Sequence, residues 1–369
     1  MNPSDRTAAR VLMTADAIGG VWTYALDVAS GLSGQGVETA LAVLGPAPAP
    51  AQRAAASAVK GLRLVETGLP LDWLAEPEAI RQSGCVVRDL AAELDVDIVH
   101  LNAPALAAAG DWARPVVGAV HSCLATWWRA AGEGPMPAEF QRRTEALRRG
   151  LNACDLLIAP TAAYAAEVAE VYGVAPPLVV HNGRRTLGAV ASGRRRRVLT
   201  AGRLWDRGKN VGVVDEAAGL IDATVEAAGP TAGPSGERAT LAHVSALGSL
   251  TTEDLRRRLA TTAVFVSVPL YEPFGLSVLE AAQAGCALVL SDIETLRELW
   301  DGAAVFAPAH DAVAVAEALQ ALLDDAEAAE RLGNAARARA RRYSLAAMTA
   351  GVLAAYGRLG PALAAEAAA

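Results

Sequence analysis

Cysteine is scarce in this chain, and the four cysteines stand far apart. Cys85, Cys123, Cys154 and Cys286 have neither the paired spacing of a zinc site nor that of a disulfide framework. We therefore expect all four to be small core residues.

Long apolar runs are also missing, although 53% of the residues are hydrophobic. Alanine supplies much of that content, and no uninterrupted run approaches the roughly 20 residues that cross a bilayer. The first residues, MNPSDRTAAR, lack the apolar core of a secretion signal, which predicts a cytoplasmic protein. The basic helix expected over residues 141–150 suits peripheral contact with the anionic inner face of the membrane, but a solvated helix face explains the same run.

A basic excess is absent as well. The net charge is −7 at pH 7 and the sequence pI is about 5.4, which argues against a nucleic-acid partner. At 369 residues the chain is long for one hydrophobic core, so we expect two domains of about 150 to 200 residues each. A cleft between two such domains is the default ligand site.

Short, β-branched apolar segments alternate with helical runs along the chain. In the first half, the strands are predicted within ARVLMTAD, VETALAVLG, VDIVHLN, PVVGAVHS, CDLLIAPT and PLVVHNG. The basic segment at residues 192–197 interrupts this order and is typical of a hinge. The alternation then restarts with RVLTAGR, DATVEAAG, HVSALG, AVFVSVP and ALVLSD. Such alternation predicts an α/β protein with two parallel sheets, each covered by helices on both faces.

Ligands of open parallel sheets bind beyond the carboxyl ends of the strands. In the first half this rule selects residues 16–20, His100, Asn102, His121 and Asn182, and in the second half Arg203, residues 269–276 and Asp292.

The segment YEPFGLSVLEAAQAGCALVLSD, residues 271–292, places two carboxylates eight residues apart around the start of a helix. Glu272 precedes Pro273, which favours extended backbone, and the following turn leads into a helical run that Gly285 can end. Glu280 is expected inside that helix, near its start. Unpaired amides at such a helix start suit a phosphate or a sugar hydroxyl, and a rigidly held carboxylate can accept both hydroxyls of a ribose. A turn residue and an exposed helix glutamate are the structural alternatives.

Two cations follow the first strand of the second half. Arg203 ends that strand and Lys209 lies six residues later on its loop, where together they could neutralise a diphosphate leaving group. Surface solvation is the alternative for either residue alone. Gly19 and Gly20 follow the first strand of the chain and could let amides approach a diphosphate, although a structural turn would use glycine equally well.

Several polar or aromatic residues cluster near strand ends of the first half. His121 could hydrogen-bond a sugar or deliver an acceptor hydroxyl, and a structural histidine is its alternative. His100 and Asn102 lie at the end of the neighbouring strand. Trp127 and Trp128 could stack on an acceptor ring or pack within the fold.

One acidic pair resembles the Asp-x-Asp metal site found in some sugar transferases. Asp95 and Asp97 form an Asp-x-Asp sequence, but they lead into the amino end of a strand, away from the ligand edge. We therefore predict no metal site and no cofactor.

Taken together, GG after the first strand, GRLWDRGKN and EPFGLSVLEAAQAGCALVLSD resemble the retaining glycosyltransferases of family 4 over nearly the whole chain. The resemblance implies the GT-B fold, in which two Rossmann-like domains face each other across a cleft. It implies a domain over residues 1–185 on the acceptor side, a nucleotide-sugar-binding domain over residues 186–345, and a final helix within residues 346–369 that crosses back to the first domain.

The resemblance also implies roles for individual residues. Arg203 and Lys209 would hold the diphosphate, Glu280 the ribose, and Glu272 the donor sugar. Amides of the turn, at Phe274, Gly275 and Leu276, would assist Glu272, and Gly20 would approach the diphosphate from the other domain. His121 would sit by the donor sugar on the acceptor side.

Two departures from the family pattern are visible. The junction reads HNGRR, where an apolar residue and Asp are common after Asn-Gly, and the lysine loop reads DRGKN, where Lys-Gly is commoner.

The expected activity is metal-independent transfer of a hexose-type sugar, with retention, from a nucleotide-diphosphate sugar to an acceptor. A small molecule, a lipid and a glycan all fit as the acceptor. A nucleotide-sugar epimerase, a sugar phosphorylase and a non-catalytic nucleotide-binding subunit are the alternatives.

Overall fold

In the computed structural model of the chain, residues 8–185, 195–234 and 236–360 are described. The chain divides into two compact units. Unit 1 comprises Met1–Gly183 with Leu345–Ala369, and unit 2 comprises Arg184–Ser344. The last described helix, α13 (Leu345–Gly357), therefore belongs with the first part of the chain.

Unit 1 is built on a parallel sheet with the strand order β3-β2-β1-β4-β5-β6-β7 among its described residues. The strands are β1 (Arg10–Asp16), β2 (Glu38–Leu44), β3 (Leu62–Glu66), β4 (Ile98–Leu101), β5 (Val116–Ala119), β6 (Leu156–Ala159) and β7 (Leu178–Val179). The helices are α1 (Gly20–Ser33), α2 (Pro50–Ser57), α3 (Pro77–Glu93), α4 (Leu124–Ala131), α5 (Ala138–Ala153) and α6 (Ala162–Tyr172), with the 3₁₀ helix η2 (Pro104–Ala109). All the predicted strands are present, and β3 is an edge strand that the prediction missed.

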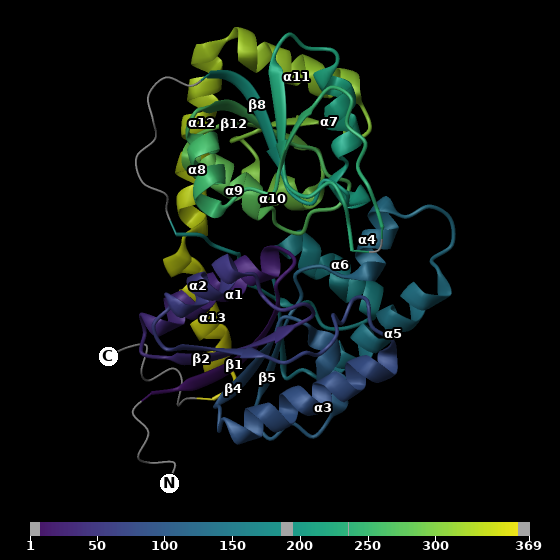
Figure 1. The fold of residues 1–369 in the computed structure, drawn as a ribbon, viewed down its shortest axis with the longest axis vertical. Coiled ribbons are helices and arrows are strands. Elements are labelled where there is room, and N and C mark those ends of the chain that lie inside the picture. Colours follow the sequence, from purple (N-terminus) through teal and green to yellow (C-terminus); the bar gives the residue numbers. More distant parts are fainter. Residues whose placement is uncertain (1–7, 186–194, 235, 361–369) are drawn as a thin grey trace. The chain divides into compact units, whose positions relative to one another are not determined.

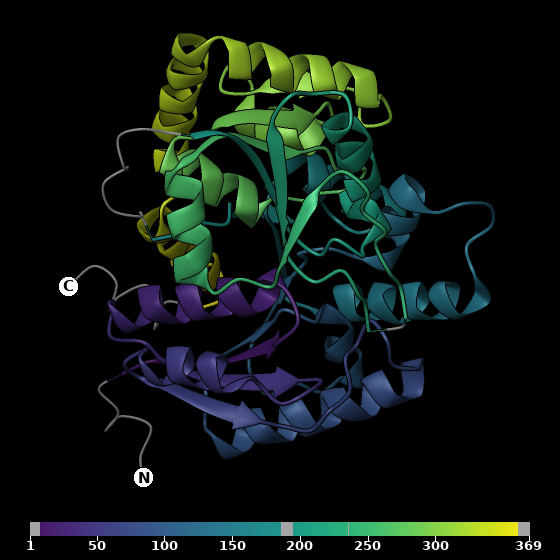
Figure 2. The same ribbon diagram turned by 45° about the horizontal axis from the view of Figure 1, so that its top comes forward.

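Alternate residues of each strand face opposite sides of the sheet, and each side is covered by helices. Val11 and Met13 pack in one apolar cluster with residues of α1 and α13. Leu12, between them, packs in a second cluster with residues of α3 and η2. Figure 2 shows this layering, with the purple α1 and the blue α3 on opposite sides of the strands.

Unit 2 has a second parallel sheet with the order β10-β9-β8-β11-β12-β13 among its described residues. The strands are β8 (Arg195–Ala201), β9 (Thr224–Ala228), β10 (Ser245–Gly248), β11 (Thr262–Ser267), β12 (Ala287–Ser291) and β13 (Val305–Ala307). The helices are α7 (Val211–Ala218), α8 (Thr252–Ala260), α9 (Leu276–Ala284), α10 (Glu294–Trp300), α11 (Ala312–Asp324) and α12 (Ala326–Ala340), with η3 (Arg207–Lys209) and η4 (Arg341–Tyr343). Figure 1 labels most of them.

The second sheet is also covered on both faces. Val264 and Val266 pack with residues of α7 and α11, whereas Phe265 packs with residues of α8, α9, α10 and α12. Two parallel sheets, each between helical layers, confirm the predicted α/β class of Rossmann-like units.

The basic segment departs from the prediction of a hinge. Residues 192–194 lie outside the described part of the chain, but Arg195 begins β8. The strand tolerates its arginines because Arg196 pairs with Asp324 at 2.8 Å and Arg197 with Glu226 at 3.3 Å. The second half of the segment is therefore part of the sheet.

Within the described residues, no helix is long and apolar enough to span a membrane, and no three His, Cys, Asp or Glu side chains gather as metal ligands would. All four cysteines are free thiols. Cys123 and Cys286 are buried, whereas Cys85 and Cys154 are half-buried, so the core prediction holds for two of them.

Candidate functional site

A tight loop after β8 carries both predicted cations. Arg203 Nη2 donates to Asp206 Oδ2 at 2.7 Å, and the other carboxylate oxygen of Asp206 accepts from the Gly208 amide at 2.9 Å. The Lys209 amide donates to the Asp206 carbonyl oxygen at 2.8 Å. Asp206 is buried, so it fixes the positions of both cations from within the loop.

The loop after β8 is joined to the segment after β11 by backbone hydrogen bonds. The amides of Leu270 and Tyr271 donate to the Gly208 carbonyl oxygen at 2.9 and 3.3 Å. Asn210 Nδ2 donates to the carbonyl oxygens of Val268 and Ala309 at 2.8 and 2.6 Å. These bonds hold the segments after β8, β11 and β13 together at the carboxyl edge of the sheet.

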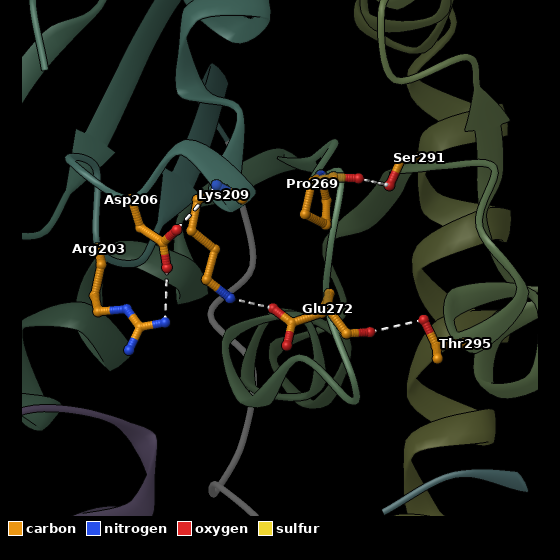
Figure 3. A network of polar contacts seen from close by, with 8 residues as sticks. Arg203, Asp206, Lys209, Pro269, Glu272, Ser291 and Thr295 are labelled. Carbon is orange, nitrogen blue, oxygen red and sulfur yellow. Dashed lines mark hydrogen bonds and ion pairs between the residues drawn. The ribbon is translucent and has the colours of Figure 1, made fainter. Parts of the chain in front are cut away.

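Lys209 and Glu272 meet where these segments join. Lys209 Nζ donates to Glu272 Oε2 at 2.5 Å, and their side chains are 25% and 10% exposed. The Glu272 carbonyl oxygen accepts from Thr295 Oγ1 at 2.7 Å, and the Pro269 carbonyl oxygen accepts from Ser291 Oγ at 2.7 Å. Figure 3 shows Lys209 and Glu272 pointing toward each other, with Arg203 and Asp206 beside them.

The helix start in the EPFGL turn forms as predicted. Gly275 is the N-cap of α9 with a φ of 87°, a left-handed conformation that favours glycine, and Gly285 caps the other end with a φ of 76°. Phe274 is buried against Tyr343, with ring centroids 5.7 Å apart, so its side chain belongs to the core. The first-turn amides, including that of Leu276, have no partner within the helix by geometry, which leaves them to a ligand or water.

Glu280 lies in the middle of α9 rather than near its start, because the helix begins only at Leu276. Its Oε1 accepts from Arg184 Nη2 at 2.8 Å, and the two side chains are 13% and 14% exposed. Arg184 belongs to the HNGRR junction, where the departure from the family pattern occurs.

The carboxyl edge of unit 1 carries the predicted glycine turn. Gly19 is the N-cap of α1, which begins at Gly20. Before it, the Ile18 amide donates to Asp16 Oδ1 at 2.9 Å. Burial, together with the nearby Asp16 carboxylate, raises the pKa of Asp72 to about 7. Asp72 therefore adds a titratable group to this edge that no strand-end pattern had indicated.

His121 is held at the end of β5 by a polar chain. Asn102 Nδ2 donates to the Thr14 carbonyl oxygen at 2.7 Å, which turns its Oδ1 toward His121 Nε2 at 2.8 Å. In the neutral ring Nε2 is then the donor and Nδ1 the acceptor atom. Tyr24 packs edge-on against the ring at 4.3 Å. Burial, and His100 nearby, lower the pKa of His121 to about 3, so the imidazole is neutral at pH 7.

The structure corrects the prediction that His100 contacts an acceptor. Its side chain is 0% exposed, and its Nδ1 lies 2.8 Å from the hydroxyl of Tyr356 in α13. Burial lowers its pKa to about 4. His100 is placed in the core because it joins β4 to α13, and it does not reach a ligand surface in this structure.

The paired tryptophans lie on α4 and are half-buried. Trp128 packs edge-on against Phe140 at 5.5 Å and donates from Nε1 to the Gly134 carbonyl oxygen at 3.3 Å. Trp127 lies tilted against Trp128 at 6.2 Å. The structure thus gives Trp128 a packing role and leaves acceptor stacking by either ring a prediction.

The basic helix expected over residues 141–150 is part of α5, and its arginines have acidic partners. Arg142 and Arg143 pair with Glu76 at 3.3 and 3.7 Å. Arg148 and Arg149 pair with Glu145 at 2.6 and 3.0 Å. These pairs reduce the positive charge that a membrane surface would meet.

Sequence reasoning missed Asp206, Arg184 and Asp72. Asp206 stands in the quoted GRLWDRGKN motif, so a carboxylate between two cations was the signal that could have found it. Arg184 and Asp72 acquire their partners only in three dimensions.

Comparison with known proteins agrees with this architecture. The family model described as Glycosyltransferase Family 4 matches residues 18–186, and that described as Glycosyl transferases group 1 matches residues 235–339. Glycogen synthase of Mycobacterium tuberculosis is 29% identical over 272 residues, which cover 66% of this chain and 64% of that protein. Alpha-maltose-1-phosphate synthase of the same species is 39% identical over 98 residues, covering 24% of this chain and 25% of that protein. The chain thus spans less than two thirds of either relative.

Solved structures share the fold over nearly the whole chain. Sucrose-phosphate synthase from Thermosynechococcus elongatus has a TM-score of 0.77 at 18% identity, covering 96% of this chain and 100% of that one. The Anabaena protein HepE in complex with UDP-glucose has a TM-score of 0.73 at 16% identity, covering 95% and 100%. Since both halves match the family models and both units have the expected parallel sheets, the chain belongs to the family 4 glycosyltransferases of GT-B fold.

Proposed function

We propose that the protein is a retaining glycosyltransferase that moves a hexose-type sugar from a nucleotide-diphosphate sugar to an acceptor hydroxyl. The observation that carries this proposal is the contact of Lys209 with Glu272. Lys209 lies in the loop that also holds Arg203, and Glu272 lies just before the first turn of α9. The relatives' names support it, since two are named glycogen synthase and alpha-maltose-1-phosphate synthase, and HepE was crystallised with UDP-glucose.

The two cations would bind the diphosphate of the donor. An arginine offers several donors in one plane, so Arg203 can keep its bond to Asp206 and present its remaining N–H groups to phosphate. The ammonium of Lys209 likewise has three donors, of which Glu272 uses one. Positive charge at this place would stabilise the leaving diphosphate without a metal ion.

Carboxylates would hold the rest of the donor. Glu280, on a rigid helix, would accept the hydroxyls of the ribose. Glu272 and the amides of Phe274, Gly275 and Leu276 would hold the sugar and stabilise positive charge that develops on its ring.

Unit 1 would supply the acceptor side. His121 would accept a hydrogen bond from a sugar hydroxyl at Nδ1, because Asn102 occupies Nε2. Gly19 and Gly20 would let the start of α1 approach the diphosphate. Trp127 and Trp128 would flank an acceptor that is a small molecule, a lipid or a glycan.

The proposed step is a front-face substitution. The bond from the anomeric carbon to the diphosphate oxygen breaks while the acceptor oxygen bonds the same face of that carbon. Because both bonds lie on the same face, the anomeric configuration is retained. The acceptor's hydroxyl proton passes to the leaving diphosphate, which balances the charge. Exclusion of water would limit hydrolysis of the donor.

The test is a donor panel. Purified protein is incubated with UDP-, GDP-, ADP- and dTDP-sugars, with and without candidate acceptors, in the presence of EDTA, and nucleoside diphosphate release is measured. Glu280→Ala is the test variant, and Glu253→Ala, which removes an exposed partner of Arg256 elsewhere in unit 2, is its control. We expect release from one donor by the wild type and the control, and little by Glu280→Ala.

The assay separates the alternatives when the remaining nucleotide sugar is also analysed and when inorganic phosphate is added in a parallel sample. An epimerase would convert the donor without releasing nucleotide, and a phosphorylase would require inorganic phosphate. A non-catalytic subunit would bind nucleotide and release nothing with any acceptor offered. The anomeric proton of the first product, observed by NMR, reports its configuration. A configuration opposite to that of the donor sugar would overturn the proposal of retention.

A further inference from the structure

Arg184 touches the carboxylate that the proposed function assigns to the ribose. Arg184 Nη2 donates to Glu280 Oε1 at 2.8 Å, and both side chains are mostly buried. This is unlike the many arginine pairs on the protein's surface, such as Arg256 with Glu253, whose side chains are 39% and 55% exposed. A pair shielded from water is held in a narrower range of positions than a solvated one.

The backbone of Arg184 is itself fixed at several points. Its amide donates to the Tyr343 carbonyl oxygen at 3.1 Å, and the residue forms an isolated parallel bridge with Ser344. Its carbonyl oxygen accepts from Gln283 Nε2 at 3.4 Å. Gln283 lies one turn beyond Glu280 on α9, so Arg184 is tied to the same helix through its side chain and its main chain.

This arrangement constrains Glu280 from outside its helix. A glutamate side chain has three rotatable bonds and samples several rotamers unless a neighbour restrains it. Arg184 supplies that neighbour, with a planar guanidinium whose direction is set by an anchored backbone. It also balances the charge of a carboxylate that is largely out of water.

We propose that Arg184 is a positioning residue that orients the Glu280 carboxylate toward the ribose hydroxyls of the donor, and so sets the preference for ribonucleotides over 2′-deoxyribonucleotides. The inference rests on the proposed function, because it assumes that Glu280 binds the ribose. Arg184 acts through Glu280 and does not itself touch the nucleotide. This role accounts for Arg184 at the HNGRR junction, where the sequence departs from the family pattern.

The test compares two ligands that differ in one hydroxyl. The dissociation constants of the ribonucleoside diphosphate found in the donor panel and of its 2′-deoxy analogue are measured by calorimetry. Release from a dTDP-sugar alone in that panel would already overturn the inferred preference for ribonucleotides. The proteins are the wild type, Arg184→Ala, Arg184→Lys, Glu280→Gln and the surface control Arg256→Ala. Thermal melting of each protein checks that it is folded. If Arg184→Ala does not fold, Arg184→Lys, which retains the positive charge, replaces it in the comparison.

We expect Arg184→Ala to weaken binding of the ribonucleotide about tenfold or more, as for loss of a charge-assisted hydrogen bond. Binding of the 2′-deoxy analogue should change much less, so that the preference for ribose falls. Arg184→Lys should restore part of it, and Arg256→Ala should leave both constants unchanged.

Equal weakening of both ligands by Arg184→Ala would overturn the inference, because it would indicate a direct contact with phosphate or a general structural role. An unchanged preference in both Arg184 variants would also overturn it. If Glu280→Gln leaves the preference intact, the ribose role of Glu280 fails, and the error then lies in the proposed function rather than in the contact between the two residues.

Discussion

Asp206 provides a test in which positioning and electrostatics predict opposite results. It carries a negative charge beside the proposed diphosphate site, so electrostatics alone predicts that Asp206→Ala tightens nucleotide binding. In the structure, however, the same carboxylate holds Arg203 at 2.7 Å and the Gly208 amide at 2.9 Å. Removing it releases the arginine and loosens the loop that carries Lys209.

The magnitudes favour positioning. Freezing an arginine side chain costs about 2 kcal/mol, and in the wild type that cost is met before the ligand arrives. Loss of the bond to the Gly208 amide adds about 1 kcal/mol of loop disorder. Against this, removing one like charge near a solvent-exposed phosphate gains about 1 kcal/mol. The balance is a loss of about 2 kcal/mol, or roughly thirtyfold weaker binding.

Calorimetric titration of the nucleoside diphosphate measures this directly. Asp206→Asn retains an acceptor for Gly208 and should fall between the wild type and Asp206→Ala. Asp324→Asn is the matched control, because Asp324 forms an exposed pair with Arg196 in the same unit. Tighter binding by Asp206→Ala would refute the positioning argument, as would an Asp324→Asn effect of equal size.

Three further predictions concern catalysis, stability and pH. Glu272→Gln should lower kcat for transfer by about a hundredfold while changing the affinity for free nucleoside diphosphate far less, as measured by steady-state kinetics beside calorimetry; parallel losses in both would contradict its role at the sugar. Gly333→Ala should destabilise unit 2 by about 1–3 kcal/mol in denaturant unfolding, because the new methyl group would lie 2.3 Å from the Gly285 carbonyl oxygen, and an unchanged midpoint would show that the helix shifts freely. Burial lowers the pKa of His100 from 6.5 to about 4, so below pH 6.5 the unfolded chain takes up a proton more readily than the folded protein does. The contribution of His100 to the free energy of unfolding is therefore fully present above pH 6.5, and about 3 kcal/mol of it is lost as the pH falls toward 4. His100→Gln should therefore lose less stability than the wild type between pH 7 and pH 4.5 in urea unfolding, and equal losses would contradict the assignment.

The α/β class could be predicted from sequence because parallel strands buried on both faces are nearly continuous apolar runs. Where that signal fades, the prediction failed. β3 has two exposed charged residues and no buried position, and β13 has just three residues. The arginines of β8 read as a hinge because their acidic partners, Asp324 and Glu226, are far away in sequence.

The local structure around the residues proposed to bind the donor was predictable because strand ends, glycine caps and prolines are local signals. The turn at Gly275 and the helix end at Gly285 required left-handed backbone, which glycine supplies. Burial was not predictable in the same way. His100 lies near the end of β4 and His121 follows β5, but α13, more than 200 residues away, covers His100.

The most direct test of the account is a crystal structure of the protein with bound nucleoside diphosphate. The account predicts the diphosphate against Arg203 and Lys209, with the ribose hydroxyls on Glu280 and the Arg184 contact retained. A nucleotide bound elsewhere, or bound here with Glu280 turned away from the ribose, would contradict it.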